Sequence, residues 1–284
     1  PLSCFHRSWC IGSRLFCRAC GGHWSAGLPV LAMSESASHR SSIVDQIVRN
    51  MSEAGYCVDP NVVSREEAGH LSDIILDLQE QESRQDTEEL GHCRVLHLLA
   101  KNPVFVQLLA HPLVVAVSET YLGKDCVCST FSSNCALPGS DLTYWHCDHP
   151  YWTISEPFQT DPPLTAHAIW CLTDMSETTG GTKFVPGSQN LGHLPDHDGD
   201  YDSLGKTPEA SAGSVIFAHG TTWHSAGRND SETARIGIFV RYARSFLIPQ
   251  EDMKAQLSFI QEPSDLVQRL MGAKQYQPQG GYPY

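Results

Sequence analysis

The nine residues from Tyr144 to Trp152, YWHCDHPYW, combine two histidines and an aspartate with four large aromatic side chains. His146 and Asp148 are two positions apart, so in an extended strand both side chains point to the same face. An imidazole nitrogen and a carboxylate oxygen can then reach one metal ion from one side. The pair alone is weak evidence, because a chain with 14 histidines contains roughly one such pair by chance.

A third metal ligand is offered by His224, which follows a strand-like run in GSVIFAHGTTWHSAG. A returning strand would bring this histidine beside the first pair. Two histidines and one carboxylate on one face of an octahedral ion form the facial triad of non-haem iron(II) oxygenases. The triad leaves three coordination positions open, which a bidentate organic acid and dioxygen can fill.

The far end of such an acid requires a cation, and Arg235 is the candidate. A buried guanidinium pairs with a carboxylate through two parallel hydrogen bonds. Arg235 opens the strand-like run RIGIFVRYAR, where Gly237 on the same face leaves room beside it. Arg241 falls on that face too, but well farther along the strand.

Two other classes of protein stay open for these residues. A zinc hydrolase can use the same three ligands with a bound water, although Arg235 then has no role. A non-catalytic binding module would hold no metal. Metal content and a titration with iron and the organic acid would separate the three classes.

The composition and net charge of the sequence argue against nucleic-acid and membrane partners. A net charge of −13 without clustered Lys and Arg argues against nucleic acid. No apolar run approaches the roughly 18 residues that a membrane span requires. The 11 cysteines follow no disulfide spacing, so we expect reduced thiols in a cytoplasmic protein. The expected partner is a small-molecule substrate, and the oligomeric state stays unknown.

Residues 1–32 differ from the rest of the chain, because they carry Arg7, Arg14 and Arg18 but no acidic residue, and they precede Met33. We predict a leader or a disordered tail here, with an organellar targeting peptide as the alternative. Residues 33–284 are predicted to form a single domain.

The elements that must position the candidate site change character at Gly123. Before it, helices are predicted from Ser42, after the capping box Ser64 to Glu67, and on both sides of Pro112. After it, short β-branched or aromatic runs alternate with turn residues, which predicts strands. These runs cover residues 126–131, 166–172, 182–185, 214–218 and 236–242, and one further short strand is predicted earlier, at residues 55–58. The pattern indicates an α+β, mainly β fold whose strands close into a sandwich or barrel.

The segments WHCDHPYW, TTGGTKFVPGSQN and WHSAGRNDSETAR resemble the phytanoyl-CoA dioxygenase family of Fe(II)- and 2-oxoglutarate-dependent oxygenases. GYCVDPNVVSREEAGHL and NPVFVQLLAHPLV resemble its N-terminal helical elements, so the resemblance runs from about Val44 to about Phe246. It implies a double-stranded β-helix, or jelly-roll, core with N-terminal helices packed on one sheet. Fe(II), 2-oxoglutarate and dioxygen are the implied cofactors.

The resemblance also implies roles for individual residues. The implied iron ligands are His146, Asp148 and His224. Halogenating relatives have a small residue at the position of Asp148, so the carboxylate favours oxygen transfer over chlorination. The implied reaction is hydroxylation, or another oxidation, of an unactivated C–H bond in a small metabolite or natural product, with release of succinate and CO2.

Arg235 matches the residue that grips the distal carboxylate of 2-oxoglutarate. Thr143 matches a position that contacts the cosubstrate in some relatives. Several members have Gly-Ser after the distal histidine, where the serine assists the arginine, whereas this chain has Ser225 directly after it. Tyr151, Trp152 and His149 are the candidates for the wall of the substrate pocket.

Overall fold

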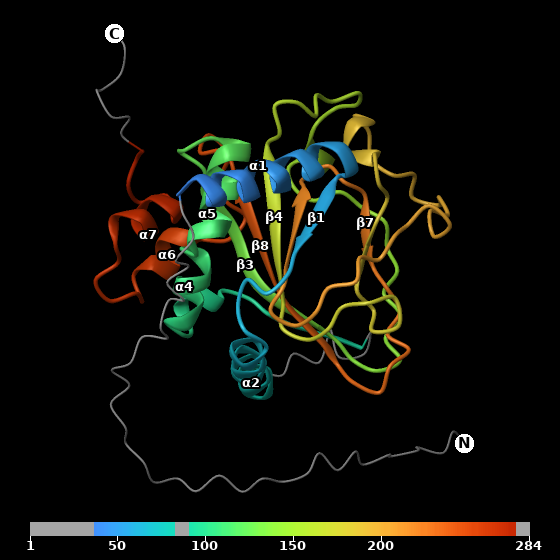
Figure 1. Ribbon diagram of the computed structural model, residues 1–284, viewed down its shortest axis with the longest axis horizontal. Helices are drawn as coiled ribbons and strands as arrows, with labels where there is room; N and C mark the ends of the chain where they lie inside the picture. Colours follow the sequence, from blue (N-terminus) through green and yellow to red (C-terminus); the bar gives the residue numbers. More distant parts are fainter. Residues whose placement is uncertain (1–36, 83–90, 277–284) are drawn as a thin grey trace, which may run out of the picture. The chain divides into compact units, whose positions relative to one another are not determined.

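Two antiparallel sheets form the core of the computed structural model, which describes residues 37–82 and 91–276. The larger sheet has the strand order β1-β6-β4-β8-β3-β2, and the smaller one pairs β5 with β7 (Figure 1). The strands are β1 (Tyr56–Asp59), β2 (His92–Val95), β3 (Val127–Ala136), β4 (Thr165–Cys171), β5 (Thr182–Phe184), β6 (Val215–His219), β7 (His224–Ala226) and β8 (Arg235–Ala243). Because sheet neighbours are distant in sequence, long connections cross between the sheets, as in a jelly roll.

The helices and short 3₁₀ turns lie mainly outside this core. The helices are α1 (Ala37–Ala54), α2 (Arg65–Glu82), α4 (Val104–Leu109), α5 (Pro112–Leu122), α6 (Met253–Leu257) and α7 (Asp265–Leu270), and the turns are η1 (Leu98–Ala100), η2 (Tyr151–Thr153) and η3 (Ser188–Asn190). Figure 1 shows α1 and α5 together over one face of the large sheet, where α1 contacts β6 and α5 contacts β4. N-terminal helices therefore cover one face of the sheet, as predicted.

Strand β4 lies at the centre of the large sheet and carries a polar side chain on the face that borders the cavity. All seven of its residues are buried, because α5 packs against one of its faces and the cavity between the sheets borders the other. Ile169 and His167 alternate with residues that face the helices. In register, His167 lies opposite Arg241 of β8, so polar groups from two central strands meet on the inner face.

Two strands were not predicted from the sequence, and both are short and polar. β2 reads HCRV and β7 reads HSA, so neither has the apolar alternation that marks a half-buried strand. Strand β3 was predicted to end at Phe131 but runs to Ala136. In each case polar side chains face the cavity instead of the apolar core, which removes the hydrophobic signal.

The leader or disordered tail predicted at residues 1–32 lies outside the residues that the structure describes.

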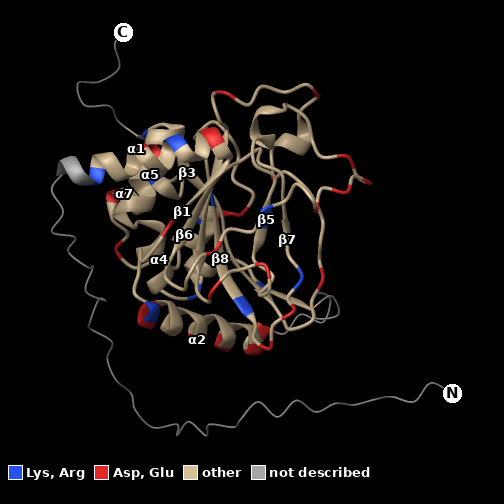
Figure 2. Ribbon diagram, turned by 45° about the vertical axis from the view of Figure 1, so that its right-hand side comes forward, with Lys and Arg blue, Asp and Glu red and all other residues tan. Residues whose placement is uncertain are grey.

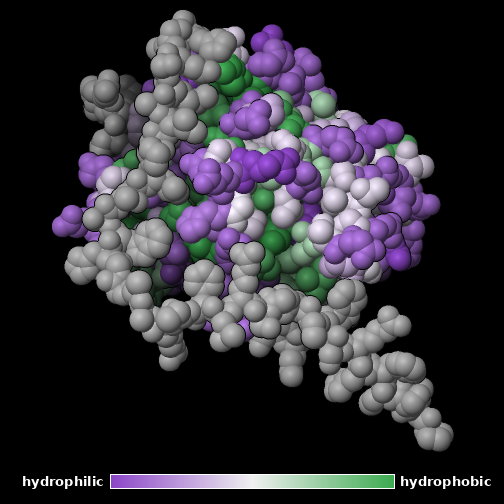
Figure 3. Space-filling model, turned by 60° about the horizontal axis from the view of Figure 1, so that its bottom comes forward, coloured by the Kyte–Doolittle hydropathy of each residue, from purple (hydrophilic) through white to green (hydrophobic). Residues whose placement is uncertain are grey.

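The surface of the described part is polar and carries charges of both signs. In Figure 2 the basic residues are scattered, while acidic residues occupy α2 and several loops. Figure 3 shows hydrophilic side chains across the face on the side of α2, with hydrophobic ones visible between them. Among residues 37–82 and 91–276, no helix has the length and apolar character that crossing a membrane requires.

The predicted capping box at the start of α2 is present and supports a stability prediction. The backbone N–H of Glu67 donates to Ser64 Oγ at 3.1 Å, and the backbone N–H of Ser64 donates to Glu67 Oε2 at 2.8 Å. Ser64→Ala is expected to lower the free energy of unfolding by about 1 kcal/mol. Urea denaturation measures the change, with Ser203→Ala at an exposed loop position as the control. Equal stability of the two variants would contradict the capping role.

Candidate metal centre

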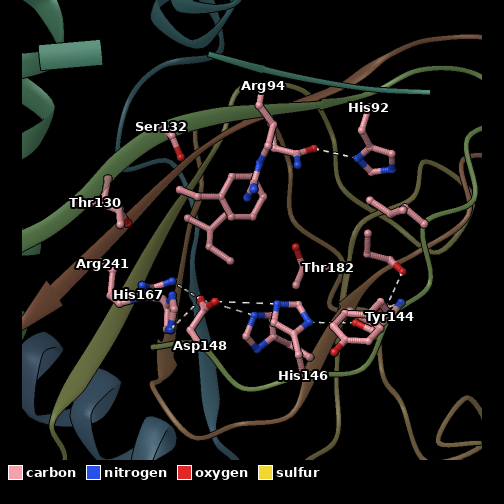
Figure 4. Close-up of a pocket in the computed structure, with 18 of the residues that line it drawn as sticks. His92, Arg94, Thr130, Ser132, Tyr144, His146, Asp148, His167, Thr182 and Arg241 are labelled. Atoms are coloured by element: carbon pink, nitrogen blue, oxygen red, sulfur yellow. Dashed lines mark hydrogen bonds and ion pairs between the residues drawn. The ribbon is translucent and has the colours of Figure 1, made fainter. Parts of the chain in front are cut away.

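A cavity of about 570 Å³ opens between the two sheets, and the inward-facing residues of several strands line it (Figure 4). On β2, β3, β4 and β5 the lining residues are two positions apart, as alternation requires. They include His92 and Arg94 of β2, Thr130, Ser132 and Asn134 of β3, His167 and Ile169 of β4, Arg235, Phe239 and Arg241 of β8, and Thr182, Phe184 and His224 of the smaller sheet. The size is typical of a small-molecule site.

His146 and His224 lie side by side because their backbones form an isolated antiparallel bridge. Each backbone N–H donates to the carbonyl of the other residue at 3.0 Å, and the two ring centroids are 4.3 Å apart. Asp148 lies after this bridge and in no strand. Its side chain therefore reaches the two histidines although the segment is not the extended strand assumed from the sequence. One ligand atom from each of the three residues lies within 4.8 Å of the others.

Backbone carbonyls set the tautomers of both histidines. Nδ1 of His146 is 2.9 Å from the Tyr144 carbonyl, and Nδ1 of His224 is 2.9 Å from the Thr222 carbonyl. A carbonyl only accepts, so Nδ1 carries the hydrogen and Nε2 keeps a free lone pair. The Nε2 atoms lie 3.8 and 3.7 Å from the Asp148 carboxylate oxygens. This donor set fits a divalent transition metal, because orienting bonds to Nδ1 are the usual partners of metal-binding histidines.

The charge states of His224 and Asp148 also favour metal binding. Burial, with a further contribution from His146, lowers the pKa of His224 to about 4, so its ring is neutral at pH 7. Burial alone would raise the pKa of Asp148, but Arg241 and the surrounding histidines outweigh it and hold the pKa far below its usual range. Near neutral pH the site therefore offers one carboxylate and an unprotonated His224 nitrogen.

Arg235 lies in the same cavity and is 2% exposed. Its Nε donates to the Gly180 carbonyl at 3.0 Å, and Nη1 donates to the Asn134 carbonyl at 3.4 Å. Gly180 has a φ of +73°, and a Cβ there would lie 2.9 Å from the Gly227 carbonyl oxygen, which explains a glycine at this place. Burial lowers the pKa of Arg235 to about 10, so the guanidinium stays charged at pH 7.

No carboxylate among the described residues forms an ion pair with Arg235. Two carbonyl oxygens orient its guanidinium and leave it a net positive charge at the cavity wall. Arg94 lies on the same wall, directly across from Asn134 in the sheet. This part of the cavity is suited to an anion.

Thr143 and Ser225 occupy different surroundings. The Thr143 hydroxyl donates to Asp141 Oδ1 at 3.0 Å, and its side chain is outside the cavity lining. Ser225 is fully buried and lines the cavity. Its Oγ accepts from the Tyr144 N–H at 2.7 Å and donates to the Ala226 carbonyl at 3.1 Å. Ser225 therefore ties the segment before His146 to β7.

Of the three candidates for the pocket wall, only Trp152 lines the cavity. Tyr151 is fully buried in a cluster with Phe158 and Trp223, and its hydroxyl accepts from the Leu164 N–H at 3.0 Å. It lies behind the site and outside the cavity lining. Trp152 is about half exposed and lines the cavity. His149 contacts the Trp152 ring, with centroids 6.1 Å apart, but is also outside the lining.

Sequence reasoning undervalued Arg241 and missed His167. Arg241 Nη2 lies 2.5 Å from Asp148 Oδ2, and His167 Nε2 lies 3.6 Å from the same oxygen. The alternation of β8 placed Arg241 on the face of Arg235, but nothing local showed that Asp148 would reach it. His167 is part of an apolar run, TAHAIWC, in which its polarity was the available signal.

Solved structures with this fold include two enzymes from nogalamycin biosynthesis. The carbocyclase SnoK matches with a TM-score of 0.58 and 21% identity over 80% of this chain and 96% of its own. The epimerase SnoN matches with a TM-score of 0.55 and 20% identity over 72% and 84%. Both are described as non-haem and α-ketoglutarate-dependent. The likeness confirms the predicted jelly-roll fold.

Curated relatives include fungal dioxygenases. Dioxygenase af480 of Aspergillus fumigatus is 28% identical over 222 residues, which cover 73% of this chain and 69% of the relative. Dioxygenase andF of Emericella variicolor is 30% identical over 173 residues, which cover 58% and 59%. The model of the phytanoyl-CoA dioxygenase family matches residues 51–237, more than half of the chain. The protein therefore belongs to the phytanoyl-CoA dioxygenase family and is an oxygenase that depends on Fe(II), 2-oxoglutarate and dioxygen.

Proposed function

We propose that His146, Asp148 and His224 hold the iron of this oxygenase and that Arg235 anchors the distal carboxylate of 2-oxoglutarate. The observation that carries the proposal is the convergence of two oriented Nε2 atoms and one charged carboxylate on a common point. With three protein ligands, an octahedral ion keeps three positions for the keto acid and dioxygen.

The bound iron supplies dioxygen activation, coupled to oxidative decarboxylation of 2-oxoglutarate to succinate and CO2. The protein's own residues orient the participants. Arg235 faces the cavity with a charge that fits a carboxylate, and its two carbonyl partners limit its motion. The positive charge of Arg94 on the same wall adds to this anion site. Because the anchor is buried, its ion pair with the cosubstrate is shielded from water.

The proposed substrate is a small metabolite or natural product with an unactivated C–H bond. The lining includes apolar and aromatic side chains, Leu142, Tyr144 and Trp152, of which Tyr144 stacks on His146 with ring centroids 5.5 Å apart. It also includes the hydroxyls of Thr130 and Ser132. Such a lining suits a compound with an apolar body and a few polar groups. That SnoN has been solved in complex with nogalamycin RO supports the same class for this chain.

A zinc hydrolase and a non-catalytic binding module are not favoured. The chain belongs to an oxygenase family, and its cavity holds a buried cation that a hydrolytic water does not require. A binding module would have no use for two histidines oriented through Nδ1 and an adjacent charged aspartate.

An anaerobic titration with Fe(II) and 2-oxoglutarate tests the proposal. We expect a weak visible absorption band from the iron-bound keto acid, and succinate release on admission of air that a true substrate stimulates. Zn(II) in place of Fe(II) should give neither signal. Activity with zinc, or the absence of any band at saturating Fe(II) and 2-oxoglutarate, would refute the assignment.

We also propose that residues 33–284 act as one domain in the cytoplasm. None of the seven cysteines among the described residues forms a disulfide, which agrees with a reducing compartment. Fluorescent fusions of the whole chain and of residues 33–284 would test whether residues 1–32 redirect it to an organelle.

A further inference from the structure

Arg241 forms an ion pair with Asp148 from the centre of the large sheet. It is 8% exposed, lines the cavity and places Nη2 2.5 Å from Asp148 Oδ2. The roles proposed so far leave this arginine without a function, because Arg235 already serves the cosubstrate. A buried guanidinium against a metal-binding carboxylate is costly to desolvate, so its placement calls for an explanation.

The guanidinium of Arg241 is fixed from its other side as well. Nη1 donates to Gln250 Oε1 in a close contact. The Gln250 segment is attached to β3, because the N–H of Gln250 donates to Ser129 Oγ at 3.1 Å and the N–H of Glu251 donates to the Ser129 carbonyl at 3.0 Å. Gln250 and the neighbouring strand therefore hold Arg241 in one orientation toward Asp148.

The two oxygens of Asp148 have different surroundings. Oδ2 lies next to Arg241 and is also 3.6 Å from His167 Nε2. Each oxygen is about equally far from one ligand histidine, since Oδ1 is 3.8 Å from His146 Nε2 and Oδ2 is 3.7 Å from His224 Nε2. The contact with Arg241 is therefore what distinguishes them. A carboxylate oxygen that accepts a short charged hydrogen bond is a weaker donor to a metal than its free partner. We call Oδ2, which Arg241 holds, the outer oxygen, and Oδ1 the inner one.

We propose that Arg241 is a positioning residue that holds the outer oxygen of Asp148, so that this carboxylate gives the iron one oxygen only. The inference rests on the ligand set proposed above. A carboxylate bound through both oxygens would fill four positions together with the two histidines. The bidentate keto acid would then take the last two of the six, and dioxygen would have none. Arg241 therefore keeps the dioxygen position open.

The experiment uses nitric oxide as a probe of that position, without turnover. Wild-type protein and three variants are loaded anaerobically with Fe(II) and 2-oxoglutarate, and the visible band reports the keto-acid complex. Nitric oxide is then titrated, and electron paramagnetic resonance reports its binding. The variants are Arg241→Met, Arg241→Lys and the control Arg244→Met. Arg244 donates to the Pro163 carbonyl and lies outside the cavity lining.

Arg241→Met is expected to keep the keto-acid band but to require about tenfold more nitric oxide for half-saturation. Arg241→Lys, which keeps a charged donor, should recover most of the affinity, and Arg244→Met should behave like the wild type. Unchanged nitric oxide binding in Arg241→Met overturns the inference. So does a parallel loss of band and nitric oxide binding that lysine does not restore, because that indicates general damage. A wild-type protein without the band would instead refute the proposed ligand set.

Discussion

We expect Asp148→Ala to abolish turnover and to weaken Fe(II) binding by more than the roughly 10–100-fold that loss of an outer partner of a metal site costs. The carboxylate is the only anionic member of the proposed ligand set, so its removal takes away both a bond and a charge. It also leaves Arg241 buried without its carboxylate partner, which destabilises the fold. Fe(II) affinity measured by anaerobic titration and succinate release are the two readouts.

The variant Asp148→Asn separates the loss of the metal ligand's charge from the loss of the partner of Arg241. Asparagine keeps the shape and an oxygen for Arg241 but loses the charge, so we expect a folded protein that still binds iron poorly. Asp141→Ala, at an exposed aspartate beside Thr143, is the matched control and should keep its activity. Full activity of Asp148→Ala would refute the ligand assignment. Halogenation would become a credible function only if that variant transferred chloride.

His146→Ala is expected to match Asp148→Ala in iron affinity and turnover, because both remove one of three ligands. His149→Ala is the control, since His149 lies three positions away but outside the cavity lining. Loss of iron binding in the His149 variant, with retention in the His146 variant, would reverse the assignment within this segment.

Arg235→Ala has the second largest expected effect, and it falls on the cosubstrate. Hydrogen bonds to charged groups contribute about 1.5–3 kcal/mol, so the 2-oxoglutarate concentration for half-maximal turnover should rise by about 10- to 150-fold. Fe(II) affinity without 2-oxoglutarate should change little, because Arg235 is not among the three metal-binding candidates. A large rise in the 2-oxoglutarate requirement with little change in Fe(II) affinity would identify Arg235 as the anchor for the keto acid.

A structural role of Arg235 must be separated from this anchor role, because the guanidinium also donates to the Gly180 and Asn134 carbonyls. Arg235→Lys keeps the charge but not the planar pair of donors, and it should recover part of the 2-oxoglutarate affinity. Thermal denaturation of each variant reports the fold. If Arg235→Ala folds and its 2-oxoglutarate requirement equals that of the wild type, another cation, with Arg94 the first candidate, holds the cosubstrate.

Local patterns in the sequence were sufficient for the helices before Gly123 and for most of the strands, but the short helices α6 and α7 were not predicted. The capping box at Ser64 and the break at Pro112 both appear in the structure, because capping and proline geometry depend on neighbouring residues only. The spacing of His146 and Asp148, with His224 and Arg235 farther on, was enough to select the chemistry.

Only the tertiary structure decided which groups act on these residues. The pairing of Arg241 with Asp148 and the position of His167 depend on the order of strands in the sheet and on their register. The tautomers of His146 and His224 depend on carbonyls that the backbone path places beside them. Tyr151 and Trp152 are adjacent in sequence, yet one is buried in the core and the other lines the cavity. A sequence carries no local signal for such contacts, because they arise between segments that meet only when the sheets close.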